Sequence, residues 1–260
     1  MKLDLFTPEL ISVLLWLAFG KLLIIGLFTI LNDLPSKQKL RVFNIKISRE
    51  QTIRELKAIW VVFTDVFALT LLVGFSLIRL ASDSPTNILV TFVTFFLWIE
   101  VWFYWTHRWM HKSDFLWKIH EYHHLSQVNQ PLTATSFSII EKFVFYTCGW
   151  FLLPTLISWY IPISADGIAL YFTYYYISSA IAHSNTEFTY SIQKHLPFGL
   201  DKFSGSGTGH ALHHARYDTN FGLLSSILDR IFGTYAEDTE KIQEKVSLGE
   251  ALENLQVIIE

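Results

Sequence analysis

The sequence HEYHH at residues 120–124 is one of three short histidine clusters in this chain. The other two are HRWMH at residues 107–111 and HALHH at residues 210–214, so eight of the ten histidines lie in these clusters. Residues three and four positions apart lie on the same face of an α-helix. Each cluster therefore predicts a helix that directs two or three imidazoles toward one point. Three such clusters predict a metal centre held by nitrogen ligands.

The histidine clusters stand beside apolar segments of membrane length. The chain has 260 residues, of which 51% are hydrophobic and 17% are charged, whereas an ordinary soluble domain has about 25% charged residues. A helix needs about 20 apolar residues to cross a bilayer. Five stretches reach or approach this length: 8–31, 58–80, 88–106, 139–161 and 167–182. The predicted fold class is therefore an all-α, integral membrane helical bundle, with four or five spans because the last stretch is short.

The distribution of basic residues predicts the orientation of this bundle. Seven lysines and arginines lie between the first two stretches, and none lies in the connector 81–87. The positive-inside rule places the basic segment in the cytoplasm, and threading onward places all ten histidines on the same side. The sequence thus predicts a multi-pass membrane protein with a cytoplasmic histidine-rich helical cap. The lack of a C-terminal dilysine signal favours a bacterial inner membrane over the endoplasmic reticulum.

The chain divides into three predicted parts. Residues 1–57 hold the N-terminal span and the basic cytoplasmic loop, residues 58–235 the other apolar stretches and the histidine clusters, and residues 236–260 a C-terminal amphipathic tail. In the tail, Ser247 followed by Glu250 is a capping-box pattern, which predicts a helix beginning there with an apolar stripe through Leu252, Leu255 and Ile259. A net charge of −3 without a block of like charge indicates no nucleic-acid partner.

The number of histidines predicts more than one metal ion. Imidazole suits iron, zinc, copper and nickel, and a zinc site takes three or four protein ligands, so eight clustered histidines point to two metals. His183, at the inner end of the last apolar stretch, is a ninth candidate, whereas His195 has no partner at helical spacing and is predicted to be a surface residue. The single cysteine, Cys148, lies in an apolar run and is predicted to be a buried hydrophobe. The predicted metal ligands are His107, His111, His120, His123, His124, His183, His210, His213 and His214.

Glu100 is the carboxylate that the pattern places nearest to a cluster. It lies seven residues before His107, two turns away on the same helical face. A carboxylate in an apolar helix is costly unless it is paired or functional. We expect Glu100 to accept the free ring N–H of a metal-bound histidine. The alternative is a salt bridge to a basic residue.

Taken together, these residues resemble the fatty acid hydroxylase/sterol desaturase superfamily of membrane non-haem di-iron enzymes. The resemblance covers roughly residues 58–235 and implies that this part is a catalytic domain. It rests on Glu100 with Tyr104, the three histidine clusters, His183-Ser184-Asn185, Asn220-Phe221-Gly222 and the run DRIFGTY at 229–235. The chain departs from the family pattern at Leu228, where a Trp is common, and at 207–209, where Thr-Pro is usual.

The resemblance implies a membrane-bound di-iron oxygenase that hydroxylates or desaturates a lipid C–H bond with O2 and two external electrons. It implies two iron ions held by the histidines, with zinc as a substitute, and catalytic roles for Glu100 and Asn185. The chain has no haem-attachment motif or dinucleotide fingerprint. The electrons are therefore expected from a separate donor, such as a ferredoxin, a cytochrome or a reductase. The other expected partners are the lipid substrate and the bilayer.

Two other classes of protein stay open on the residues alone. A histidine-lined membrane metal transporter would place its ligands along a path within the spans. A zinc-dependent membrane hydrolase would need an open site with three ligands and a nearby acid or base. The number of metal ions bound per chain separates these classes from a di-iron oxygenase.

Overall fold

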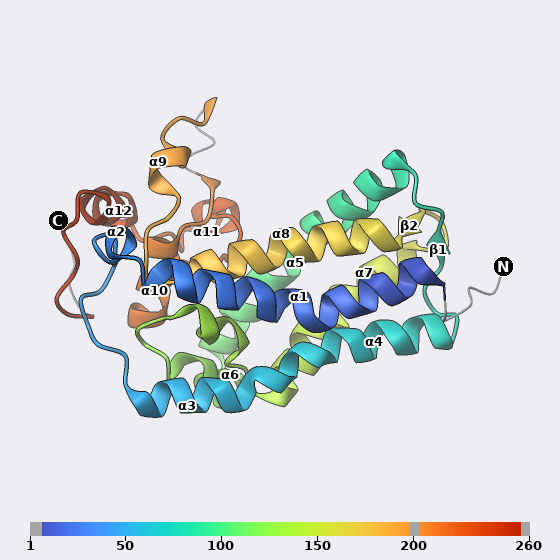
Figure 1. The fold of residues 1–260 in the computed structure, drawn as a ribbon, viewed down its shortest axis with the longest axis horizontal. Coiled ribbons are helices and arrows are strands. Elements are labelled where there is room, and N and C mark those ends of the chain that lie inside the picture. Colours follow the sequence, from blue (N-terminus) through green and yellow to red (C-terminus); the bar gives the residue numbers. More distant parts are fainter. Residues whose placement is uncertain (1–6, 198–202, 256–260) are drawn as a thin grey trace.

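A computed structural model describes residues 7–197 and 203–255 of the protein. Three helical segments are long and apolar enough to cross a membrane: α1 (Pro8–Asn32), the continuous stretch Arg49–Gly74 and α5 (Pro85–Lys112). The second of these consists of α3 (Arg49–Ala58), the short 3₁₀ segment η1 (Ile59–Val62) and α4 (Phe63–Gly74). Helix α1 packs against α4, and α5 runs obliquely to them in Figure 1. This arrangement of helices confirms the predicted all-α membrane bundle.

The last two predicted stretches are helical as well. The π-helical segment η3 (Glu141–Cys148) continues directly into α7 (Gly149–Ile157), and α8 (Ala165–Ala182) packs between α1 and α5. Neither is among the helices that are long and apolar enough to span in the described part of the chain. The number of spans, four or five, therefore stays a prediction.

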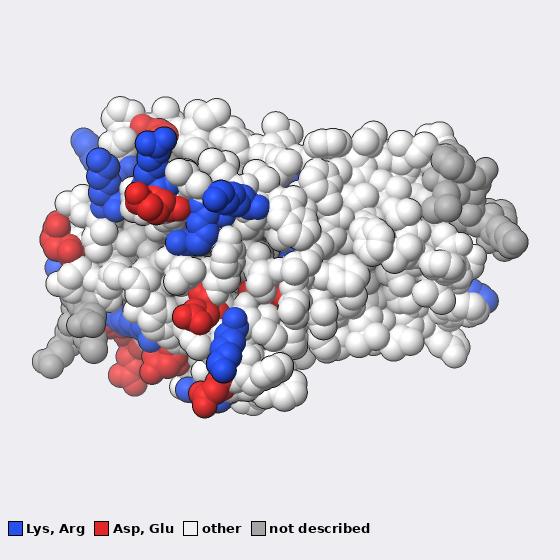
Figure 2. Space-filling model, turned by 90° about the horizontal axis from the view of Figure 1, so that it is seen from below, with Lys and Arg blue, Asp and Glu red and all other residues white. Residues whose placement is uncertain are grey.

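Aromatic side chains fill the interior of the bundle. Phe95, Phe103, Trp150 and Tyr171 are all buried there. Large apolar side chains also cover the outside, and Figure 2 shows Lys, Arg, Asp and Glu gathered at one end of the molecule with little charge over the rest of that face. An uncharged exterior of this kind suits contact with lipid chains, because a charged side chain in the hydrocarbon layer is costly.

The charged end of the bundle carries a helical cap. Its elements are α2 (Pro35–Gln38), α6 (Asp114–His124), η2 (Pro131–Thr135), α9 (Tyr190–Gln193), α10 (Gly207–Arg216), α11 (Ile227–Ile231) and α12 (Thr239–Ser247). The parallel pair of β1 (Leu80–Ala81) and β2 (Ile163–Ser164) lies at the opposite end, near the start of α1 (Figure 1). The cap has its own small core, in which Phe43, Leu212, Ile242 and Leu252 are buried together. The basic segment between α1 and α4 thus shares an end of the molecule with the histidine clusters.

The predicted helix in the C-terminal tail is wrong. Helix α12 ends at Ser247, where the prediction had a helix begin, and Gly249 follows with φ +92°. This left-handed conformation favours glycine and stops a helix. Leu252 is buried because it pairs with Phe43 in an isolated β-bridge, not because it lies on a helical stripe. Ile259 lies outside the described residues.

Cys148 is exposed, which corrects its predicted burial. The π-helical segment turns Glu141, Lys142, Tyr146 and Thr147 toward the interior and leaves position 148 on the outside.

Lys21, the charge that interrupts the first apolar stretch, faces the interior. Its Nζ donates a hydrogen bond of 2.7 Å to the carbonyl oxygen of Ala134.

Candidate metal centre

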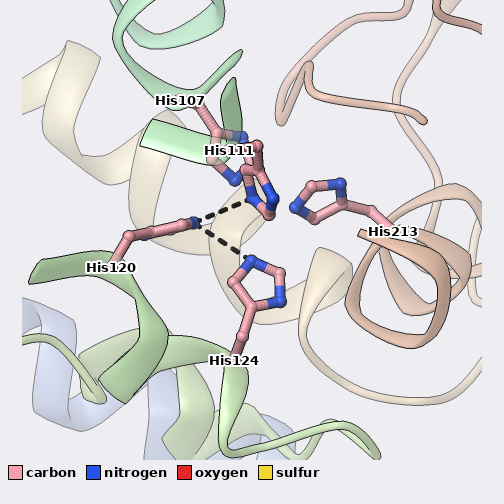
Figure 3. A group of neighbouring side chains, drawn as sticks. All are labelled: His107, His111, His120, His124 and His213. Atoms are coloured by element: carbon pink, nitrogen blue, oxygen red, sulfur yellow. Dashed lines mark hydrogen bonds between the residues drawn. The ribbon is translucent and has the colours of Figure 1, made fainter. Parts of the chain in front are cut away.

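The nine predicted ligands converge in two adjoining groups. His107, His111, His120, His124 and His213 form the five-histidine group, and His123, His183, His210 and His214 form the four-histidine group. In each group the potential ligand atoms lie within 4.8 Å of one another. Figure 3 shows the five rings directed at a common centre from three segments of the chain. All nine side chains are buried except His111, which is half-buried.

Helices α6 and α10 each contribute to both groups, which corrects the prediction that each cluster directs its rings toward one point. In α6, His120 and His124 are four residues apart and share one group, whereas His123 turns into the other. In α10, His213 joins the first group while its neighbour His214 joins the second. The rings of His124 and His214 lie 4.5 Å apart, centroid to centroid. The two groups are therefore neighbours held by the same pair of helices.

Five rings donate their Nδ1–H to backbone carbonyl oxygens. The pairs are His107 with Phe221 (2.7 Å), His123 with Ser136 (3.0 Å), His183 with Ser179 (2.8 Å), His213 with Thr219 (2.7 Å) and His214 with Ser126 (3.0 Å). A carbonyl oxygen only accepts, so Nδ1 must carry the proton and Nε2 carries the lone pair of the neutral ring. Contacts of this kind orient metal-binding histidines.

The lone pairs that result are aimed at one another. His123 and His183 bring their Nε2 atoms to 3.5 Å, although neither carries a proton there. The Nε2 atoms of His107, His213 and His214 are buried without a hydrogen-bond partner. Buried acceptors in this state are costly unless a cation or donor lies between them. The donor set therefore fits two metal ions.

The charge state of the rings agrees with this fit. Burial, reinforced by neighbouring histidines, lowers the pKa of His120, His123 and His214 well below the ordinary value for histidine. These side chains are therefore neutral near pH 7. Metal binding requires the unprotonated ring.

Glu141, which no motif in the sequence marks, is the carboxylate that contacts a grouped histidine among the described residues. Its Oε1 accepts a hydrogen bond of 2.6 Å from Nδ1 of His120, and both side chains are fully buried. Glu100 was expected to make such a contact. Its carboxylate instead accepts a hydrogen bond from Oγ of Ser225, in the loop after Phe221. The one feature of the sequence that could have indicated Glu141 is its charge, because it stands near the start of the apolar stretch 139–161.

Asn185 holds the cap rather than facing the two groups. Its backbone has φ +50°, and its side chain accepts a bond of 2.9 Å from the Phe43 N–H and donates one of 3.0 Å to the Phe43 carbonyl. Both polar atoms of its amide are thereby used. These contacts assign Asn185 a clamping role between the end of α8 and the basic segment, and its predicted catalytic role stays untested.

Buried carboxylates hold the loops that accept from the histidines. Asp229 accepts from the N–H groups of Phe221 and Gly222 at 2.8 and 2.7 Å, which places the Phe221 carbonyl against His107. Similarly, Glu55 accepts from Oγ of Ser126 at 2.7 Å, the residue whose carbonyl orients His214. Asp229 lies in the DRIFGTY run, whereas Glu55 had no motif to mark it.

The tenth histidine behaves differently from the other nine. His195 is exposed on the cap and belongs to neither group. Its predicted place on the surface is confirmed.

Comparison with known proteins identifies the family. The pattern of the family described as fatty acid hydroxylase matches residues 92–234, more than half of the chain and all nine grouped histidines. The chain belongs to the fatty acid hydroxylase family. This finding confirms the superfamily that the histidine motifs resemble.

Several curated plant and animal proteins are similar to this fatty acid hydroxylase family member. Protein CER1-like 2 of Arabidopsis thaliana is 30% identical over 152 residues, covering 56% of this chain and 24% of that protein. Very-long-chain aldehyde decarbonylase GL1-6 of Oryza sativa subsp. indica is 26% identical over 245 residues, covering 91% of this chain and 37% of the relative. Alkylglycerol monooxygenase of Xenopus tropicalis is 28% identical over 173 residues, covering 65% of this chain and 35% of that protein.

The chain thus spans about a quarter to a third of the length of these relatives. No solved structure matches it.

Proposed function

We propose that this protein is a membrane-bound di-iron oxygenase that hydroxylates or desaturates a lipid C–H bond with O2 and two external electrons. The observation that carries the proposal is the division of nine histidines, eight buried and one half-buried, into two adjoining groups at the end of an apolar helical bundle. In this proposal the five-histidine group holds one ion and the four-histidine group the other. Iron is the proposed metal, and zinc is a substitute that imidazole ligands also accept.

The chain's own residues prepare the site for this chemistry. Backbone carbonyls fix the tautomer of five rings, and burial keeps the rings neutral and excludes water. Two bound iron ions would supply O2 activation and removal of hydrogen from an unactivated C–H bond. The residues that would hold them are the nine grouped histidines. Glu100 and Asn185 keep proposed roles in support of the site.

The position of the centre suits a lipid substrate. The three candidate spans present large apolar side chains on their outer faces, and His107 and His111 lie in the last turns of one of them, α5. A lipid in the adjoining leaflet would reach the centre from the bilayer. We place the cap in the cytoplasm, at a bacterial inner membrane, where a ferredoxin, cytochrome or reductase would deliver the electrons.

A second reaction is favoured by the extent of one match. The rice very-long-chain aldehyde decarbonylase matches 91% of this chain, more than the monooxygenase does. A long-chain aldehyde is therefore the second candidate substrate, with a product one carbon shorter.

Lipid analysis of cells with and without the intact protein tests these reactions. A strain expressing the wild type is compared with one expressing His124→Ala, which removes a buried ring of the five-histidine group. Hydroxylation adds one oxygen atom to a lipid, desaturation removes two hydrogens, and decarbonylation shortens the chain. An identical lipid profile in the two strains, despite equal expression, would contradict the proposed function.

Metal analysis separates the other two classes. The purified protein should contain two metal ions per chain, because the potential ligand atoms of each histidine group lie within 4.8 Å of one another and can surround one ion. A transporter would show variable occupancy and a mononuclear zinc hydrolase would show one ion. The grouping at one end of the bundle, rather than along the spans, also disfavours transport.

A further inference from the structure

The π-helical segment η3 arranges its polar residues in an unusual way. Glu141, Lys142, Tyr146 and Thr147 are all buried, and the two pairs are five residues apart. Hydrogen bonds in a π-helix join residues five apart, and π segments occur frequently at functional sites. In an α-helix the two pairs would point in different directions. The π register therefore brings both pairs to one interior face.

Two tryptophans of α5 lie against this segment. The indole Nε1 of Trp102 donates a bond of 2.6 Å to the carbonyl of Phe145, and that of Trp98 donates one of 2.8 Å to the carbonyl of Gly149. A Cβ at Gly149 would lie 2.2 Å from Nε1 of Trp102, so only glycine permits this approach. The indoles bind backbone carbonyls in and next to the π segment, which stabilises irregular backbone at membrane depth.

Two hydrogen bonds join the start of the segment to the histidine helix α6, and a third one links the two residues that make them. Oγ of Ser138 donates to the carbonyl of Ile119 at 3.0 Å and accepts from the N–H of Glu141 at 3.2 Å. The carboxylate of Glu141 then accepts from Nδ1 of His120 at 2.6 Å. Next to it, Nζ of Lys142 pairs with Asp65 on α4 at 2.6 Å. The same turn of the π segment thus directs Glu141 to His120 and Lys142 to Asp65.

We propose that Glu141 is the positioning residue for His120, and that it controls the metal of the five-histidine group without affecting that of the four-histidine group. The proposal rests on the proposed function in assuming two bound metals. His120 is the one ring of the nine whose described Nδ1 contact is to a carboxylate. The other oriented rings use carbonyl groups. A carboxylate partner raises the basicity of a ligand ring and fixes its orientation.

Anaerobic titration of the purified full-length chain with Co(II) tests this assignment. The visible absorption of Co(II) reports the geometry of its ligands as well as the number of ions bound. Glu141→Ala removes the acceptor, whereas Glu141→Gln keeps an oxygen that can accept from His120. Glu121→Ala is the matched control, because Glu121 lies next to His120 on α6 but is exposed. Thermal unfolding of each apo-protein monitors folding.

We expect wild type and Glu121→Ala to bind two ions tightly. Glu141→Ala should bind one ion as before and the other about 10- to 100-fold more weakly, with a changed spectrum for the weak ion. Glu141→Gln should recover most of the lost affinity because its amide oxygen can accept from Nδ1 of His120, whereas Glu141→Met, which fills a similar volume without an acceptor oxygen, should not. Should Glu141→Ala fail to fold, Glu141→Met tests the proposal in its place, with the same selective weakening of one ion expected.

Two outcomes would overturn the assignment while leaving the two-metal proposal intact. One is a folded Glu141→Ala protein that binds both ions like the wild type. The other is an equal loss of both ions, which would indicate general disruption of the cap. Fewer than two ions in the wild type would instead contradict the proposed function itself, and with it this inference.

Discussion

At the scale of single residues, replacing either of two nearby histidines on α10 should remove a different metal ion from the protein. His210 and His213 are three residues apart, yet they belong to different groups. We expect His210→Ala and His213→Ala each to abolish activity and each to lower the metal content of the purified protein by about one ion. His195→Ala is the control and should resemble the wild type in both respects, because its ring is exposed. Elemental analysis together with product formation measures the effect, and full activity in either cluster variant would contradict two cooperating metals.

Asn185 should matter for stability more than for chemistry. Asn185→Ala removes two hydrogen bonds to the backbone of Phe43 in a buried setting. Each such bond contributes about 0.5–1.5 kcal/mol, so we expect a lowered unfolding temperature. Activity per bound metal ion should stay near that of the wild type. A variant with unchanged unfolding temperature and no activity would show instead that the predicted catalytic role is correct.

Glu100 should affect activity without holding metal. Its carboxylate accepts a hydrogen bond from Ser225. Within the described residues it makes no hydrogen bond to a histidine, although one was predicted. Glu100→Gln keeps an acceptor for Ser225 and the volume of the side chain. We therefore expect two metal ions per chain. Loss of the negative charge next to the loop whose Phe221 carbonyl orients His107 should reduce activity by about 10- to 100-fold, the range found for groups that act on a metal ligand from outside the ligand set. Loss of one metal equivalent would make Glu100 a direct ligand.

At the scale of elements, the contact between α5 and η3 should stabilise the bundle. Trp102→Phe keeps the aromatic ring but removes the donor to the Phe145 carbonyl. A buried acceptor left without a partner costs about 1–3 kcal/mol, and no water replaces the indole in the apolar layer. We expect a lower unfolding temperature in detergent or lipid discs. Trp109→Phe is the matched control on the same helix, because Trp109 is 64% exposed, and equal effects of the two changes would contradict a specific role for Trp102.

At the scale of the whole molecule, charge and histidines share one end of the bundle (Figures 1 and 2). If that end is cytoplasmic, the connector before α5 lies outside the cell. We expect Ser82→Cys to react with an impermeant thiol reagent on intact cells, and Glu121→Cys to react only after permeabilisation. Both positions are exposed, and Cys148 must be replaced first because it is exposed as well. Labelling of position 121 from outside would reverse the orientation.

The sequence by itself determined the features that local spacing encodes. Apolar runs predict the bundle because a membrane helix must satisfy its own backbone, and a spacing of three or four residues predicts the shared face of each histidine pair. The pairs four residues apart each fall in one group, namely His107 with His111, His120 with His124 and His210 with His214. The pairs three residues apart, His120 with His123 and His210 with His213, are divided between the groups. The nine candidate ligands could therefore be named before their positions were known.

Only the tertiary structure decided how these residues are divided and supported. His213 and His214 are neighbours in sequence but join different groups. The rings around His213 come from α5 and α6, whereas those around His214 come from α6, from α10 and from the residue that follows α8. Glu141 reaches His120 through a π register that α-helical spacing does not anticipate. Asn185 is occupied by Phe43, which is 142 residues away in sequence. Such contacts depend on distant segments meeting in space, and the periodicity of one segment carries no record of its partner.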